Sequence, residues 1–133
     1  MKKAILLLIT VACLSFTTNP AAREFDKNMV GVWKGFEKDK QYEGTEKHWI
    51  QERTADGKYR IIFTAVQNCD VQTFVEKGKW WTEKGKFYEQ AEDSKDIDVY
   101  QYEVVDNLVV KFKSITLLGK ADSTYEFEDY RID

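Results

Sequence analysis

The chain has 133 residues, of which 43% are hydrophobic and 32% charged, so it has material for one compact domain and is too short for two of ordinary size. Its formal net charge of -3 comes from 23 acidic and 20 basic residues mixed along the sequence. There is therefore no basic field to hold phosphate backbones, and nucleic acid is excluded as an expected partner. The four Trp, seven Tyr and eight Phe, with a single Pro, favour strands over helices.

The start of the chain has the pattern of a bacterial export signal. Two lysines precede the apolar run 4–14, which is shorter than the roughly 20 apolar residues that a membrane span needs. Small residues before Arg23 predict cleavage at that point. We expect a signal peptide over 1–22, one folded domain over 23–133, and a periplasmic or secreted location.

A second processing route stays open. Thr10-Val11-Ala12-Cys13 resembles the lipobox of bacterial lipoproteins, in which the cysteine is lipidated and becomes the new N-terminus. On that route Cys13 anchors the protein to a membrane, which is otherwise not an expected partner. Either route leaves Cys69 as the lone cysteine of the mature domain, so no internal disulfide is expected despite an oxidising compartment.

The rest of the sequence is a series of strand-like runs separated by short turns. Asp56-Gly57 marks the clearest hairpin, because this pair tolerates the positive φ values of tight turns. Gly78 predicts a bulge or bend in the fourth run. The eight predicted strands are 29–38, 45–53, 58–66, 71–82, 86–91, 97–105, 108–114 and 123–132.

These strands predict an all-β fold. Each connection is too short for a crossover helix, so consecutive strands should pair antiparallel as a meander. Closure of the sheet removes its exposed edges, which favours an eight-stranded antiparallel up-and-down barrel. A barrel of this size is filled by side chains or holds one small ligand. The aromatic residues expected inside are Trp33, Tyr59, Phe63, Trp80, Tyr102, Phe112 and Phe127.

Gly31-Val32-Trp33 near the start of the first strand, together with Arg131 in the last, resembles the lipocalins and the wider calycin group. The resemblance implies that the late basic residue packs over the Trp at the closed end of the barrel. Lipocalins usually carry a helix after the last strand, whereas this sequence stops after its final predicted strand, so it is most similar to compact lipocalin-like domains of exported bacterial proteins. Binding of a small apolar or amphipathic molecule is what that similarity implies.

The sequence offers no recognisable catalytic or metal-binding pattern. The sole histidine, His48, lies on a predicted strand without a nucleophile partner, and one His with one mature Cys cannot build a usual zinc site. The acidic stretch 92–98 lacks the glycine and the spacing of a calcium loop. We therefore expect neither an enzyme nor a cofactor.

Strand alternation and side-chain chemistry select a candidate ligand-binding set. Its members are Trp33, Trp49, Arg53, Phe63, Trp80, Tyr102 and Phe112. The sequence does not decide which face of the strand 45–53 points into the barrel, because Trp49 and Ile50 are both apolar and lie on opposite faces. Arg53 and Gln51 share a face with Trp49, and if that face is inside, the buried arginine needs a carboxylate on the ligand or on the protein.

The sequence is compatible with two kinds of function, ligand binding and protein interaction. The first is a non-enzymatic protein that binds an apolar or amphipathic ligand in the barrel, which requires that side chains leave part of the interior empty. The alternative is an envelope-associated interaction or inhibitor module that uses its loops or outer barrel face. A contiguous exposed patch around Trp49, Trp81 and Tyr88 would favour the alternative.

Overall fold

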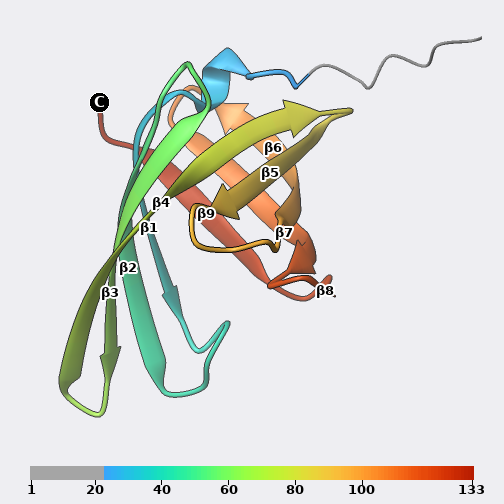
Figure 1. The fold of residues 1–133 in the computed structure, drawn as a ribbon. Coiled ribbons are helices and arrows are strands. Elements are labelled where there is room, and N and C mark those ends of the chain that lie inside the picture. The colour runs from blue at the N-terminus through green and yellow to red at the C-terminus, as the bar shows by residue number, and fades with distance from the viewer. Residues whose placement is uncertain (1–22) are drawn as a thin grey trace, which may run out of the picture.

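The computed structural model describes residues 23–133, so the predicted signal peptide and Cys13 lie outside the described residues. In this part of the chain the regular secondary structure is nearly all strand, as predicted (Figure 1). The elements are a 3-10 helix η1 (Lys27–Met29) and the strands β1 (Gly31–Lys38), β2 (Thr45–Arg53), β3 (Lys58–Gln67), β4 (Asp70–Glu83), β5 (Lys86–Ala91), β6 (Asp98–Asp106), β7 (Val109–Leu117), β8 (Lys120–Ala121) and β9 (Glu126–Arg131).

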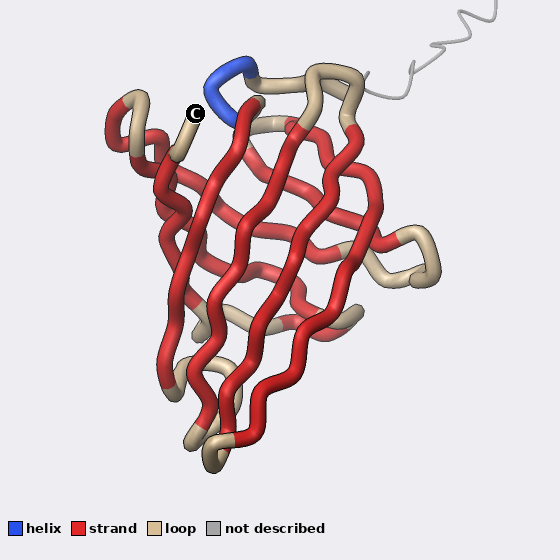
Figure 2. Tube along the Cα trace, turned by 90° about the vertical axis from the view of Figure 1, so that its left-hand side faces the viewer, coloured by secondary structure: helices blue, strands red, loops and turns tan. Residues whose placement is uncertain are grey.

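The strands close into one antiparallel barrel. β1 to β7 pair in chain order, β7 also pairs with β9, and β9 returns to β1 through Trp33 opposite Arg131 and Gly35 opposite Asp129 (Figure 2). β8 pairs only with the end of β7 and lies outside the ring. The predicted eight-stranded meander barrel is therefore confirmed, with one small strand added.

The last strand is shorter than the predicted run 123–132. The Asp122 carboxylate accepts hydrogen bonds from the backbone N–H of Thr124 at 2.7 Å and of Tyr125 at 3.3 Å. This side-chain turn competes with the ladder, so β9 begins only at Glu126.

Of the bulge or bend predicted at Gly78, the bulge is not formed. Pairing runs through this residue without a register shift, to Tyr59 on one side and Ala91 on the other. The glycine instead makes room for a neighbour, because a Cβ there would lie 2.5 Å from the Tyr59 ring.

Aromatic side chains fill much of the interior, as expected. All seven aromatic residues predicted to lie inside are either buried or packed against the core. The rings of Phe87 and Phe112 meet edge to face at 5.2 Å, and Phe112 stacks on Phe127 at 4.6 Å. Each such ring contributes a few kcal/mol, on the order of 2 to 3, through burial.

One end of the barrel, the closed end, is covered by η1 (Figures 1 and 2). Here the Arg131 guanidinium lies 4.3 Å from the centre of the Trp33 ring, as expected, and donates hydrogen bonds to the carbonyls of Asn28 and Val30. A Cβ on Gly31 would lie 2.3 Å from Arg131 Nη1. The glycine before the Trp is thus the space through which the arginine reaches the ring.

The opposite end, the open end, is left open by a mismatch in strand length. β4 has 14 residues and β5 has six, and β5 pairs only with positions 78–83 of β4. Residues 70–76 of β4 therefore pair with β3 alone among the described residues. In Figures 1 and 2 the hairpins of β1 to β4 extend beyond the remaining strands.

Candidate ligand-binding cavity

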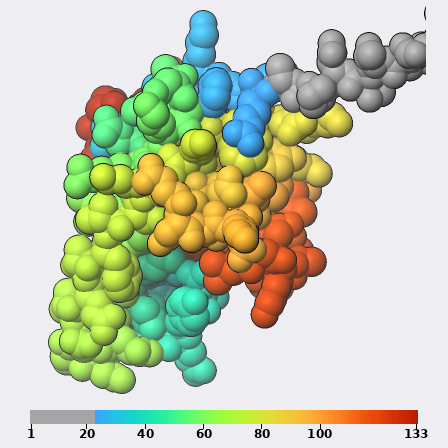
Figure 3. Space-filling view, viewed as in Figure 1, coloured from blue at the N-terminus to red at the C-terminus, as the bar shows by residue number. Residues whose placement is uncertain are grey.

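The open end contains a cavity of about 580 Å³, within the usual range for small-molecule sites of about 300–1,000 Å³. It lies between the inner faces of β2 to β4 and the inner faces of β5, β6, β7 and β9. In Figure 3 the teal β1–β2 region is seen in a recess between the yellow-green β3–β4 hairpin and the orange and red strands. Its apolar wall includes Trp49, Ile61, Phe63, Phe74, Tyr100, Leu117 and Phe127.

The structure settles the orientation of β2. Trp49, Gln51 and Arg53 are buried on the inner face, whereas Ile50 is exposed on the outer face. Gly35 on the neighbouring strand stands opposite Trp49, and a Cβ there would lie 2.0 Å from the indole ring. The small residue makes the space that a Trp inside the barrel needs.

The carboxylate that Arg53 requires comes from the protein. Arg53 is 1% exposed, and its Nη2 donates to Asp129 Oδ2 and, at 2.6 Å, to Gln51 Oε1. The other Asp129 oxygen accepts the Trp49 indole N–H at 2.8 Å. Asp129 was missed from the sequence, although it has the same strand parity as the inward Phe127.

Aromatic rings surround the rest of the Arg53 guanidinium. Its central carbon lies 5.0 Å from the centre of the Phe87 ring, 5.3 Å from that of Phe112 and 5.7 Å from that of Trp33. Its Nε and Nη1 have no hydrogen-bond acceptor among the described residues, so cation–π attraction stabilises this side of the charge. Arg53 thus belongs to the packed closed half of the barrel.

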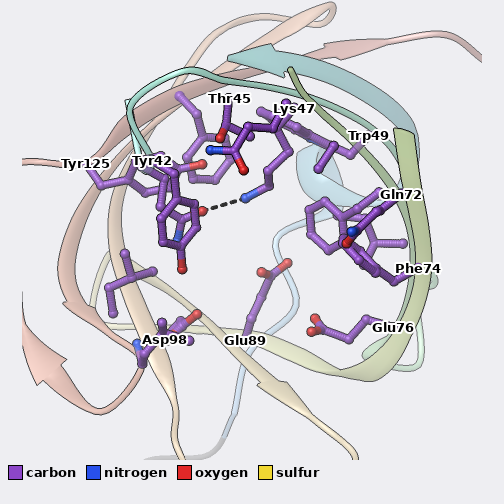
Figure 4. Close-up of a pocket in the computed structure, with 18 of the residues that line it drawn as sticks. Tyr42, Thr45, Lys47, Trp49, Gln72, Phe74, Glu76, Glu89, Asp98 and Tyr125 are labelled. Carbon is purple, nitrogen blue, oxygen red and sulfur yellow. Dashed lines mark hydrogen bonds between the residues drawn. The ribbon is translucent and has the colours of Figure 1, made fainter. Parts of the chain in front are cut away.

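Glu89 on β5 is directed into the cavity (Figure 4). Its Oε1 accepts a 2.6 Å hydrogen bond from Gln51 Nε2 and lies 3.9 Å from Arg53 Nε, and its side chain is 18% exposed. Burial raises the pKa of Glu89 to about 7, although Arg53 and Gln51 act in the opposite direction. This carboxyl therefore changes charge near neutral pH.

Two further carboxylates line the same space (Figure 4). Glu76 on β4 accepts a hydrogen bond from the Tyr59 hydroxyl at 2.7 Å. Asp98 at the start of β6 accepts one from the Leu118 N–H at 2.7 Å, and burial raises its pKa. Burial, with Glu89 and Glu76 nearby, also raises the pKa of Tyr59, which therefore stays a neutral hydrogen-bond donor.

Lys47 is the basic residue of the cavity wall. Its Nζ donates to Gln41 Oε1 at 2.6 Å, lies 3.8 Å from Glu37 Oε1, and sits 5.0 Å from the centre of the Phe63 ring. Burial lowers the pKa of Lys47, against the opposing effect of Glu37 and Glu76. The ammonium group is thus already engaged by the protein.

Two of the seven residues predicted for ligand binding, Trp49 and Phe63, line the cavity. The other five lie outside its wall, and they are Trp33, Arg53, Trp80, Tyr102 and Phe112. Strand parity indicates which side chains point inside, but it carries no information about their position along the barrel axis. That position decides whether a side chain lies in the packed closed end or in the hollow open end.

The exposed patch around Trp49, Trp81 and Tyr88 that would have favoured an interaction module is not formed. Trp49 is inside the barrel, and Trp81 is only 4% exposed on the outside. Tyr88 stacks on Trp81 at 5.2 Å, and the Arg23 guanidinium lies 4.0 Å from the centre of the Trp81 ring. The N-terminal segment therefore shields this aromatic pair.

The fold and the cavity define a small closed antiparallel barrel that is packed at one end and hollow at the other. No family model matches the chain, and a search of curated proteins gives no match either. Within residues 23–133, no group of three or more His, Cys, Asp or Glu side chains is placed to hold a metal ion. Over the same residues, no helix is long and apolar enough to cross a membrane.

Proposed function

We propose that this protein is an exported, non-enzymatic lipocalin-like barrel that binds a small amphipathic molecule in the cavity at its open end. The observation that carries the proposal is a space of about 580 Å³, with aromatic walls, that the protein's own side chains leave unfilled. The Arg131–Trp33 contact behind Gly31 supports the lipocalin-like assignment. Export rests on the charged and apolar pattern of the N-terminal segment.

The apolar wall favours a ligand with an apolar body. Phe74 points inward from the part of β4 that pairs on one side only, and it is 50% exposed. Phe63 stands opposite it on β3. A ligand covering these rings would remove apolar surface from water at about 25 cal/mol per Å², and this gain supports binding at the open end.

The test uses the fluorescence of Trp49 in the cavity wall. Titration of the protein with 1-octanol should give a saturable change in tryptophan emission. Ala65→Phe places a ring in the cavity and should abolish the response, because Ala65 lies on its wall. Thr64→Phe is the matched control, since the neighbouring residue on the same strand points outward and should keep the response.

Circular dichroism establishes that each variant is folded before the titration is interpreted. An unchanged emission from the folded wild type would remove the proposal. A response that survives Ala65→Phe as well as Thr64→Phe would place binding elsewhere and count equally against the cavity.

A second candidate, protein interaction through the outer barrel face, is favoured by one other observation. Ile50, Ile62 and Val75 stand directly opposite one another on β2, β3 and β4, and all three are exposed. Among the described residues, the adjoining edge over 70–76 has no strand partner on its far side, and free edges pair readily with other strands. Sedimentation velocity of wild type and Ile62→Lys tests the simplest partner, a second copy of the chain, whose association the lysine should abolish.

A further inference from the structure

The ionisable groups of the cavity wall are unbalanced in charge. Four carboxyl groups line it, those of Asp70, Glu76, Glu89 and Asp98, against the single ammonium group of Lys47. Figure 4 shows the Glu76 and Glu89 carboxylates directed into the cavity, in which Glu89 is half-buried and Glu76 is exposed. The cavity therefore presents hydrogen-bond acceptors and negative charge to anything that enters it.

The protein's own interior cations do not neutralise this excess. Arg53 bonds Asp129 directly and reaches Glu89 only at 3.9 Å, whereas Lys47 lies beside Glu37. Within residues 23–133, neither Glu76 nor Asp98 forms an ion pair. Of the four carboxylates, those of Glu89 and Asp98 are half-buried, and the nearest cation to Glu89 is Arg53 at 3.9 Å. A positively charged ligand would therefore supply compensation that the protein supplies only in part.

The aromatic wall suits the same kind of ligand. This interior already holds two side-chain cations against rings, Arg53 beside Phe87 and Phe112, and Lys47 above Phe63. Trp49 and Tyr100 line the cavity together with Glu89. A cation near the Glu89 carboxylate would therefore meet aromatic faces as well as negative charge.

We propose that the cavity selects an organic cation, a protonated amine with an apolar body. Its N–H groups donate to the carboxylates of Glu89 and Glu76, and its apolar part lies along Phe63 and Phe74 toward the open end. The inference rests on the proposed ligand-binding function and specifies the chemical class of the ligand. Charge-assisted hydrogen bonds in a partly enclosed site supply the selectivity.

An anionic amphipath held by Lys47 is the competing arrangement. Lys47 already donates to Gln41 and lies beside Glu37, so a ligand carboxylate would have to displace these partners. It would also face the repulsion of the cavity carboxylates. The charge distribution therefore favours the cation, and the experiment includes the anion as one arm.

The test compares three ligands that share an eight-carbon chain and differ in head group: octylammonium, 1-octanol and octanoate. Isothermal titration calorimetry at pH 8 on the protein expressed from the full sequence should rank octylammonium first. We expect it to bind about tenfold more tightly than 1-octanol, the ratio that about 1.4 kcal/mol of charge-assisted bonding provides. Octanoate should bind more weakly than 1-octanol.

Two comparisons assign the preference to the cavity. Glu89→Gln should reduce the octylammonium to octanol ratio to about twofold without weakening 1-octanol, whereas Glu52→Gln, the same change on the outer face of β2, should leave the ratio intact. Lowering the pH from 8 to 5.5 should have the effect of Glu89→Gln, because Glu89 takes up a proton there. The charged and titratable groups facing Glu89 are Arg53, Tyr59, Glu76, Asp98, Tyr100, Tyr125 and Asp129.

The outcomes separate this inference from the function on which it rests. Binding of 1-octanol or octanoate at least as tight as octylammonium, and lost in Ala65→Phe, would keep the ligand-binding function and overturn the cation. An octylammonium preference that Glu89→Gln and low pH leave unchanged would also overturn it, because the selectivity would arise elsewhere. No binding of any of the three ligands by folded protein would overturn both.

Discussion

Replacing Glu89 by glutamine should stabilise the protein at alkaline pH and leave its stability unchanged in acid. Glutamine has nearly the shape of a protonated glutamic acid and can still accept the hydrogen bond that Gln51 Nε2 donates. It cannot ionise, so it avoids the cost of a charge in the cavity wall. The perturbation therefore isolates the ionisation of one carboxyl group.

The direction of this stability change follows from the ionisation of Glu89 in the folded and in the unfolded state. The pKa of Glu89 is raised from its ordinary 4.5 to about 7 in the folded protein, so between these values the folded state binds more protons than the unfolded state. The free energy of unfolding of the wild type then falls as pH rises from about 4.5 to 7 and is lowest above 7. Since one pKa unit corresponds to about 1.4 kcal/mol, the full difference is about 3 kcal/mol.

Urea denaturation followed by tryptophan fluorescence at pH 4 and pH 8.5 measures this difference. We expect Glu89→Gln to equal the wild type at pH 4 and to exceed it by up to about 3 kcal/mol at pH 8.5. Glu52→Gln, on the exposed face of β2, should match the wild type at both pH values. A glutamine variant that is less stable than the wild type at pH 8.5 would refute the reasoning, because Glu89 would then stabilise the fold as the partner of Arg53.

Three further changes test the packing behind the cavity, all by the same urea assay. Arg53→Met should cost about 3–5 kcal/mol, because it leaves Asp129 buried without its cation. Arg53→Met with Asp129→Leu should recover only part of the loss, because the Trp49 indole N–H then loses its acceptor. Gly35→Ala should cost about 1–3 kcal/mol, since its methyl would overlap the Trp49 indole. Arg131→Ala should lower stability by about 2 kcal/mol and speed amide hydrogen exchange at the closed end. Unchanged exchange would show that the contact of Arg131 with Trp33 does not hold the closed end together.

The sequence predicted the strands and their order because both are set by local chemistry. Turn residues such as Asp56-Gly57 fixed the ends of the hairpins, and short connections allowed only antiparallel neighbours. The predicted contact between Arg131 and Trp33 also formed. The late start of the last strand, at Glu126, was missed, because the Asp122 side chain, which accepts hydrogen bonds from nearby backbone N–H groups, competes with the ladder without changing the apolar pattern.

The cavity was harder to predict because it depends on where strands end relative to their neighbours. Parity placed Phe63 and Trp80 on the inside, and both prove to be in the interior, yet only Phe63 lies at the depth of the cavity. Glu89 and Asp129 share strand parity with Phe87 and Phe127, so their inward direction was open to inference. Acidic residues usually lie on the outer face of a barrel. The alternation of residues along the strands therefore did not distinguish the inward Glu89 and Asp129 from ordinary outward carboxylates.

The two halves of the barrel interior differ in what their side chains do for the protein. At the closed end the charged Arg53 is paired with Asp129 and surrounded by aromatic rings. At the open end, β4 continues past its partner and the half-buried Glu89 faces an unfilled space, which costs stability that an apolar side chain would not. Proteins tend to break packing rules of this kind where a site is needed. A ligand that carries positive charge on an apolar body would both fill the empty space and compensate the carboxylate charge. A fatty acid would only fill the space, and so would a neutral hydrocarbon.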